Sequence, residues 1–303
     1  MNTFRERVSR RTVLVRGGQA ALTATALTAT ALVNARIEPL WAAPGSRRFR
    51  IGGCEWMLGK CEPASLELAK RIGLDGIQLG MGTGADGVDL RKPEVRQAYL
   101  DAARKTGLEI SSLSLAWMNA MPLKSDPRAA QWLADSIDAG KALGLPNIMP
   151  ACFGPGDLDM ANAREIDRVV AVLKGAAPKA EKAGMTLGLE SYLSAEDNLK
   201  ILDRVGSPAL KVYYDVGNST DKGRDVLKEI PLMGKRICEF HFKDAAFRLG
   251  RGRIDFRKVR DALDKIDYSG WIHIESAVTR SAAEDYAADY RYLRGIFPER
   301  TAR

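Results

Sequence analysis

The sequence contains few of the residues that build histidine-rich or cysteine-rich metal sites. Among its 303 residues are two histidines, His241 and His273, and four cysteines that form no CxxC pair. A cluster in which many histidines hold several metal ions therefore cannot be built, and the cysteines do not have the spacing of a zinc site. Long runs of lysine and arginine are also missing, so the charge pattern does not indicate nucleic-acid binding.

Half of the net charge of +8 belongs to residues 1–43, which predict an export signal rather than a part of the fold. The stretch SRRTVLV places Arg10 and Arg11 before a run of small, weakly apolar residues, and it resembles a twin-arginine signal. Four threonines make that run a poor spanning helix, which favours cleavage over the alternative of a membrane anchor. We expect cleavage near 33–35 or 40–43, and a periplasmic or otherwise extracytoplasmic protein without a stable membrane span.

The cysteines are expected to be mostly free thiols, because the twin-arginine route carries proteins that have already folded in the reducing cytosol. Cys152 and Cys238 lie in apolar, strand-like runs and are interpreted as small core residues. The pairing that the sequence leaves open is Cys54 with Cys61 after export.

From Arg48 onward, short β-rich runs alternate with longer amphipathic runs, a pattern typical of βα units and a parallel sheet. Eight runs are expected to be strands: 49–56, 76–81, 108–115, 147–154, 185–191, 210–218, 237–244 and 270–277. Eight such units predict a single-domain α/β fold, a (β/α)8 TIM barrel over residues 44–303. The alternative is an open doubly wound sheet, but the Gly-rich run 80–87 lacks the Lys-Ser/Thr of a phosphate loop and is interpreted as a βα loop.

Four of the later strands each end with a possible metal ligand: Glu190, Asp215, His241 and Glu275. The carboxyl ends of barrel strands meet at one rim, so these side chains are expected to lie close together. Three neighbouring carboxylates would repel one another, and each would be costly to bury without a partner. A divalent cation solves both problems, and three carboxylates with one imidazole suit Mn²⁺, Mg²⁺, Co²⁺ or Zn²⁺.

Five segments, GLES, YYDVGN, HFKD, LGRGRIDF and WIHIES, carry a resemblance to a known family. They resemble the xylose-isomerase-like TIM barrels, and more narrowly the sugar phosphate isomerase/epimerase branch, over essentially all of residues 48–297. The resemblance implies that the four ligands bind one divalent ion, often manganese, and that Glu190 and Glu275 also act as acid and base. Moving a proton at the carbon beside a carbonyl requires a base on one face and an acid on the other. The metal would stabilise the enediolate.

Substrate contacts are expected from Lys243, Glu196, Asn218 and Trp117. Lys243 faces the same side as His241 if the strand is regular, and the alternative is a salt bridge with a neighbouring acid. Glu196 matches a substrate-contact position of the family, and the alternative is an exposed acid in the first turn of a helix. Asn218 stands where ketose epimerases commonly have histidine. Trp117 is one of three aromatic residues that could stack on a sugar, with Trp56 and Phe153.

Two further polar residues are expected one layer deeper in the barrel than the metal ligands. Glu239 is interpreted as part of a buried hydrogen-bond network, and His273 as a residue that supports the site rather than binding the metal. Tyr213 is expected to face the interior by the alternation of side chains along the strand.

The sequence leaves several functions open for this site. The first is a metal-dependent isomerase or epimerase of a sugar, and the second is a lyase or hydratase of 3-keto sugars or polyol acids that uses the same enolate chemistry. The less favoured functions are a phosphodiesterase like the apurinic endonucleases, which would require a histidine cluster, and a barrel that only binds sugar. The expected partner is a small sugar, not nucleic acid, and the chain could assemble as a homo-oligomer.

Overall fold

A computed structural model describes residues 49–298 of the chain, except residues 60 and 86. The predicted export signal over residues 1–43 lies outside the described residues. Within the described part, none of the helices combines the length and the apolar composition that crossing a membrane requires.

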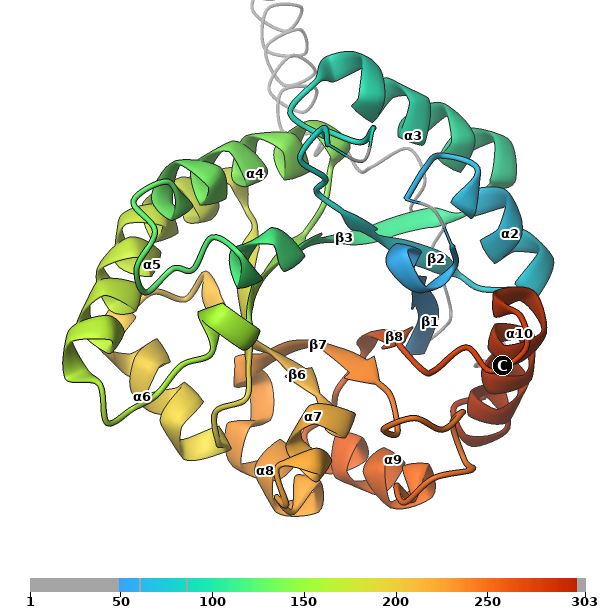
Figure 1. Cartoon of the computed structure of the whole chain (residues 1–303). Helices are drawn as coiled ribbons and strands as arrows, with labels where there is room; N and C mark the ends of the chain where they lie inside the picture. The colour runs from blue at the N-terminus through green and yellow to red at the C-terminus, as the bar shows by residue number, and fades with distance from the viewer. Residues whose placement is uncertain (1–48, 60, 86, 299–303) are drawn as a thin grey trace, which may run out of the picture. The chain divides into compact units, whose positions relative to one another are not determined.

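Eight parallel strands close into a barrel in which every strand pairs with its neighbours in chain order and β1 pairs with β8 (Figure 1). The strands are β1 Phe49–Cys54, β2 Gly76–Gly80, β3 Glu109–Leu115, β4 Asn147–Cys152, β5 Thr186–Ser191, β6 Leu210–Asp215, β7 Ile237–Phe242 and β8 Gly270–Ile274. The predicted (β/α)8 barrel is therefore confirmed, and the open doubly wound sheet is excluded.

The helices surround the strands as an outer layer (Figure 1). They are α2 Ser65–Ile72, α3 Pro93–Thr106, α4 Ala129–Leu143, α5 Ala163–Ala183, α6 Ala195–Val205, α7 Val216–Asp221, α8 Val226–Met233, α9 Phe256–Lys265 and α10 Ala282–Ile296. Each of α2 to α6 ends at a glycine in the left-handed conformation, which only glycine adopts without strain. These glycines end the helices just before the next strands begin.

Six of the eight strands end earlier than the sequence pattern suggested, because the chain turns at the rim, whereas β3 and β5 end where expected. The run 210–218 was expected to be one strand, but β6 ends at Asp215 and α7 begins at Val216. The Asp215 carboxylate caps this helix by accepting a hydrogen bond from the backbone N–H of Asn218 at 2.9 Å. A side chain that both ends a strand and caps a helix is held in a fixed position at the barrel mouth.

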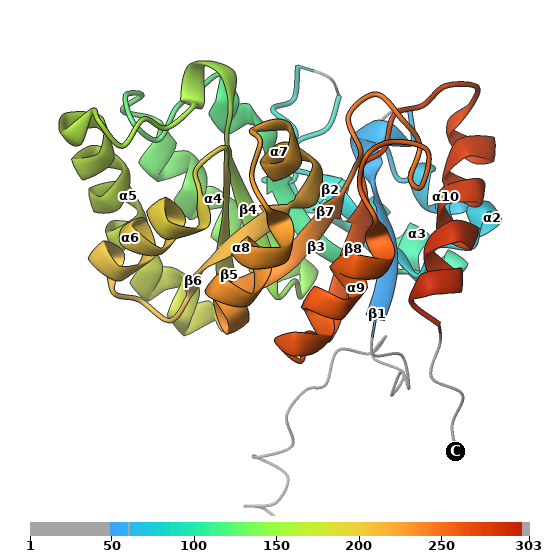
Figure 2. The same cartoon turned by 90° about the horizontal axis from the view of Figure 1, so that it is seen from below.

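Four short 3₁₀ helices complete the secondary structure of the described part: η1 Glu55–Met57, η2 Ala116–Asn119, η3 Gly154–Gly156 and η4 Gly234–Arg236. Three of them directly follow β1, β3 and β4, and in the side view α7 also lies at this carboxyl end of the barrel (Figure 2). The loops and short helices of this end therefore surround the strand termini on which the predicted ligands lie.

Candidate metal and active site

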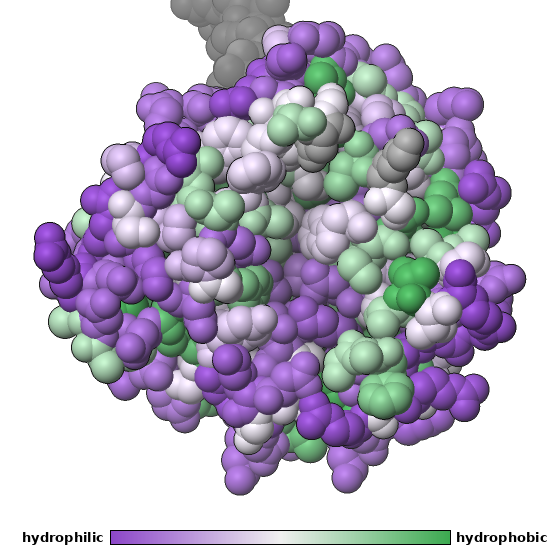
Figure 3. All heavy atoms as spheres, viewed as in Figure 1, coloured by the Kyte–Doolittle hydropathy of each residue, from purple (hydrophilic) through white to green (hydrophobic). Residues whose placement is uncertain are grey.

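The four predicted ligands meet at the carboxyl end of the barrel. Glu190, Asp215, His241 and Glu275 each offer one ligand atom, and these atoms all lie within 4.8 Å of one another. Glu190, Asp215 and His241 are 2%, 3% and 0% exposed, whereas the Glu275 side chain is 17% exposed. The face seen in Figure 1 is hollowed at its centre, where hydrophilic residues line the depression (Figure 3). The cluster is therefore buried on its inner side, with Glu275 as its more open member.

His241 uses its two ring nitrogens differently. Its Nδ1 lies 2.8 Å from a Glu190 carboxylate oxygen and 3.6 Å from Glu275 Oε2. Its Nε2 lies 2.7 Å from Gln78 Oε1, and because an amide oxygen can only accept, Nε2 carries the proton of this hydrogen bond. In the neutral ring, Nδ1 then has its lone pair toward the carboxylates, as a metal ligand requires.

Asp215 and Glu275 share the ammonium group of Lys243. Lys243 Nζ lies 2.8 Å from Asp215 Oδ2 and 2.9 Å from Glu275 Oε2. Burial raises the pKa of Asp215, and Lys243 only partly offsets this effect. For Glu275 burial acts in the same direction, but His241 and Lys243 outweigh it and lower the pKa. The pKa of His241, beside Glu190 and Glu275, also lies well above its usual value, so two cationic side chains face the three carboxylates of the cluster.

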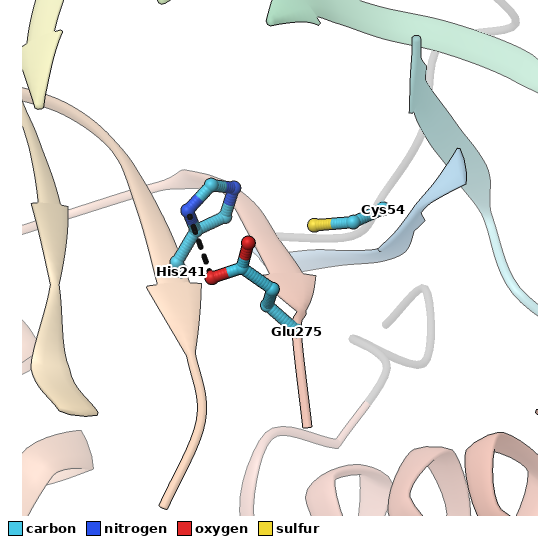
Figure 4. A group of neighbouring side chains, drawn as sticks. All are labelled: Cys54, His241 and Glu275. Carbon is cyan, nitrogen blue, oxygen red and sulfur yellow. Dashed lines mark ion pairs between the residues drawn. The ribbon is translucent and has the colours of Figure 1, made fainter. Parts of the chain in front are cut away.

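Glu275 follows directly on β8, and its backbone N–H donates to the carbonyl of Phe242 at 3.0 Å, so the strand pairing continues to this residue. Trp56 donates from Nε1 to Glu275 Oε1 at 3.1 Å. Figure 4 shows the Glu275 carboxylate turned toward the His241 ring, with the Cys54 thiol pointing toward the same pair. Hydrogen bonds to both oxygens fix the orientation of this acid at the open side of the cluster.

A second polar layer lies deeper in the barrel. His273 Nε2 is 2.6 Å from Ser111 Oγ, and His273 Nδ1 is 2.6 Å from the Tyr213 hydroxyl. Burial lowers the pKa of His273 well below its usual value, so this ring is neutral. Glu239 accepts hydrogen bonds from Ser112 at 2.7 Å and from Asn147 at 2.6 Å. The expected inner positions of Glu239, His273 and Tyr213 agree with these contacts.

The predicted substrate residues are spread over the rim. Lys243 contacts two of the predicted metal ligands, so the alternative salt bridge is the arrangement found. Asn218 lies in α7 and contacts Asp215 through its backbone. Glu196 is an exposed acid of the first turn of α6, and Trp117 lies in η2 with 40% exposure. The structure brings Lys243 and Asn218 to the ligand cluster, whereas Glu196 and Trp117 lie on the surrounding elements.

Sequence reasoning missed three contributors to the site. Gln78 on β2 accepts a hydrogen bond from His241 Nε2. It is the single polar residue inside the apolar run GIQLG, and this was the feature of the sequence that could have indicated its role. Trp56 was considered only as a stacking surface, but it is a hydrogen-bond donor to Glu275. Cys54 was considered as a disulfide partner of Cys61, but no disulfide joins the described cysteines, and Cys54 belongs to the site.

Residues 66–296 match the family described as the xylose isomerase-like TIM barrel. The chain belongs to this family. It is also 30% identical over 177 residues to the 2-epi-5-epi-valiolone 7-phosphate 2-epimerase of an Actinoplanes species, a match that spans 58% of this chain and 65% of that protein.

Two further comparisons extend over most of the barrel. The L-ribulose-5-phosphate 3-epimerase of Escherichia coli is 26% identical over 278 residues, which cover 85% of this chain and 97% of that protein. The crystal structure of D-allulose 3-epimerase from a Methylomonas species in complex with D-allulose aligns with a TM-score of 0.70 and 20% identity, over 83% of this chain and 98% of that chain. The relatives are sugar epimerases, and the structural likeness supports the shared fold.

Proposed function

We propose that the protein is a divalent-metal-dependent isomerase or epimerase that moves a proton at the carbon beside the carbonyl of a sugar or sugar derivative. The observation that carries this proposal is the convergence of Glu190, Asp215, His241 and Glu275 within 4.8 Å. The epimerase names of the relatives support the reaction class.

The donor set fits a single divalent cation. Three carboxylates and one imidazole match the ligands that Mn²⁺, Mg²⁺, Co²⁺ and Zn²⁺ accept in proteins, and we propose Mn²⁺ as the natural ion. Glu190, Asp215, His241 and Glu275 would hold it, with His241 offering Nδ1 because Nε2 is bonded to Gln78. When bound, the cation would stabilise the negative charge of an enediolate.

Glu190 and Glu275 are proposed to carry the proton transfers. Glu190 lies on β5 and Glu275 directly follows β8, and both carboxylates approach His241 Nδ1, at 2.8 Å from Glu190 Oε1 and 3.6 Å from Glu275 Oε2. One carboxylate removes the proton from one face of the substrate carbon and the other returns a proton on the opposite face, which inverts the centre. Lys243 and Trp56 orient Glu275 through its two oxygens.

A lyase or hydratase of 3-keto sugars or polyol acids is the second candidate. The observation that favours it is Asn218, which replaces the histidine common in ketose epimerases and is 6% exposed beside Asp215. An amide cannot exchange a proton near neutral pH as a histidine can. The same removal of a proton beside a carbonyl would then be followed by loss of a leaving group instead of return of the proton.

The test uses keto-sugars in deuterated solvent, with chelated protein and with added Mn²⁺. An epimerase should incorporate deuterium at the stereocentre only when the metal is present, and the sugar should otherwise keep all of its atoms. Release of water or of an aglycone would instead indicate a lyase or hydratase. Asp215→Asn should abolish metal binding and activity, and Asp203→Asn is the control because Asp203 is an exposed partner of Arg236 outside the ligand cluster. Full activity and metal content in Asp215→Asn would refute the proposal.

We also propose that the chain is exported through the twin-arginine signal predicted at its start. Support comes from the sequence alone, because the signal lies outside the described residues. An exported enzyme would meet sugars that have entered from outside the cell, and the substitution of the two arginines tests this directly, as set out below.

A further inference from the structure

Cys54 occupies an unusual place for a barrel cysteine. It is the last residue of β1, it is fully buried, and its side chain points toward His241 and Glu275 (Figure 4). Its sulfur, a ring nitrogen of His241 and a carboxylate oxygen of Glu275 all lie within 4.8 Å of one another. The thiol donates to Gln78 Oε1 at 3.7 Å, a long contact for a weak donor. The sulfur therefore belongs to a ligand-like group.

The other cysteines have ordinary surroundings. Cys152 is 1% exposed and packs in the main apolar core. The thiol of Cys238 donates to the carbonyl of Val212 at 3.3 Å. Among the described residues, Cys54 is the cysteine that belongs to a group of three possible metal ligands. Filling space in the core does not require an imidazole and a carboxylate within 4.8 Å of the sulfur.

We propose that Cys54, His241 and Glu275 form a second coordination set for a divalent cation, suited to thiophilic ions such as Zn²⁺ and Cd²⁺. Sulfur ligands select soft metals, whereas the carboxylate-rich set of Glu190 and Asp215 suits Mn²⁺ and Mg²⁺. Both sets need His241 and Glu275, so one ion at a time is held. On binding, the thiol proton passes to solvent as the sulfur–metal bond forms, and no electron is transferred.

This second set has a consequence for the enzyme. An ion held by Cys54 would engage Glu275, the acid or base of the proposed function, and would keep His241 away from the oxygen-rich set. Zn²⁺ or Cd²⁺ should therefore compete with Mn²⁺ and inhibit. The inference goes beyond the proposed reaction, and it can be tested by binding alone, without a substrate.

The test is titration of the chelated full-length protein with Co²⁺, Cd²⁺ and Mn²⁺. Wild-type protein with Co²⁺ should show the near-ultraviolet band of thiolate-to-cobalt charge transfer. Cys54→Ser should lose this band and weaken Cd²⁺ binding by about tenfold or more, while Mn²⁺ binding changes little. Cys61→Ser is the matched control, because Cys61 is partly exposed and belongs to neither ligand set, and it should keep the band.

The outcomes separate this inference from the proposed function. Normal Mn²⁺ binding without a thiolate band in the wild-type protein would overturn the second set and leave the first intact. Failure of every divalent ion to bind would overturn both. If Cys54→Ser does not fold, cadmium NMR of the wild-type protein decides the question, because a cadmium signal without sulfur coordination would refute the inference and a sulfur-shifted signal would support it.

Discussion

Replacing Gln78 by leucine tests how the structure prepares His241 to bind a cation. Gln78 lies on β2 and His241 on β7, and the 2.7 Å contact between Gln78 Oε1 and His241 Nε2 joins two strands that β8 and β1 separate in the barrel. Both side chains are 0% exposed, so water cannot replace the amide oxygen easily. Gln78→Leu removes the acceptor of His241 together with the amide NH2 group, whose one contact is a long one to Met149 Sδ at 3.7 Å.

Two effects of this substitution can be estimated. A buried N–H left without an acceptor costs about 1–3 kcal/mol of the free energy of unfolding. The ring can avoid part of this cost by moving its proton to Nδ1 and donating to Glu190, which lies 2.8 Å away. That tautomer has no lone pair for a cation at Nδ1, so the affinity for Mn²⁺ should fall by about 10–100-fold, the range found when partners of metal-binding histidines are removed.

The measurements are calorimetric titration with Mn²⁺ and urea unfolding of the chelated protein. Gln97→Leu is the control, because Gln97 makes an exposed hydrogen bond to Asp101 on α3 and its loss should change stability by less than about 0.5 kcal/mol. Equal Mn²⁺ affinity in Gln78→Leu and wild-type protein would show that the amide does not set the tautomer, and the account of His241 given above would then be wrong.

Three further predictions follow from the site and from the sequence. Lys243→Met removes the ammonium group that pairs with two acids, so the free energy of unfolding of the chelated protein in urea should fall by about 3 kcal/mol. Mn²⁺ should restore most of this loss, and equal losses with and without Mn²⁺ would contradict the prediction. Gly217→Ala places a methyl group 2.7 Å from the Lys243 carbonyl oxygen, which should cost about 1–3 kcal/mol and weaken Mn²⁺ binding; unchanged melting and binding would count against this packing. Replacement of Arg10 and Arg11 by lysine should leave an uncleaved precursor in the cytoplasm on fractionation, and normal export would rule out the twin-arginine route.

The fold and the convergence of Glu190, Asp215, His241 and Glu275 could be predicted because their signals are local. Each strand is a short β-rich run, and a helix that ends in glycine precedes many of them. A residue at the end of a barrel strand lies at the rim, and this placement follows from its position in the strand alone. Glu190, Asp215 and His241 could therefore be placed together from their positions in three successive strands.

The partners of these ligands could not be predicted in the same way. The Gln78–His241 contact spans 163 positions, and the Trp56–Glu275 contact spans 219. Such contacts depend on how far each strand is shifted along the barrel and on the rotamer of each side chain. The side to which Lys243 points was predicted from alternation, but its ion pairs with Asp215 and Glu275 depend on the distances to these carboxylates.

The two histidines show how the barrel separates support from chemistry. Ser111 Oγ donates to the carbonyl of Ile77 at 2.8 Å, so it accepts from His273 Nε2, while Tyr213 donates to Nδ1. Both nitrogens of His273 are thus occupied, and the ring cannot bind a cation without breaking this chain. Tyr213 packs its ring against His241 at a centroid distance of 4.5 Å, and so the lower histidine positions the upper one.

The acids of the inner layer and of the rim differ in the groups that surround them. Burial raises the pKa of Glu239 to about 7, and hydrogen bonds from Ser112 and Asn147 only partly offset this effect. Glu239 can therefore be neutral where the barrel is dry, at little electrostatic cost. At the rim, burial likewise raises the pKa of Asp215 to about 7, whereas His241 and Lys243 lower the pKa of Glu275. The carboxylates that could hold a divalent cation thus gather at the mouth of the barrel, where the Glu275 side chain is 17% exposed, and not in the inner layer.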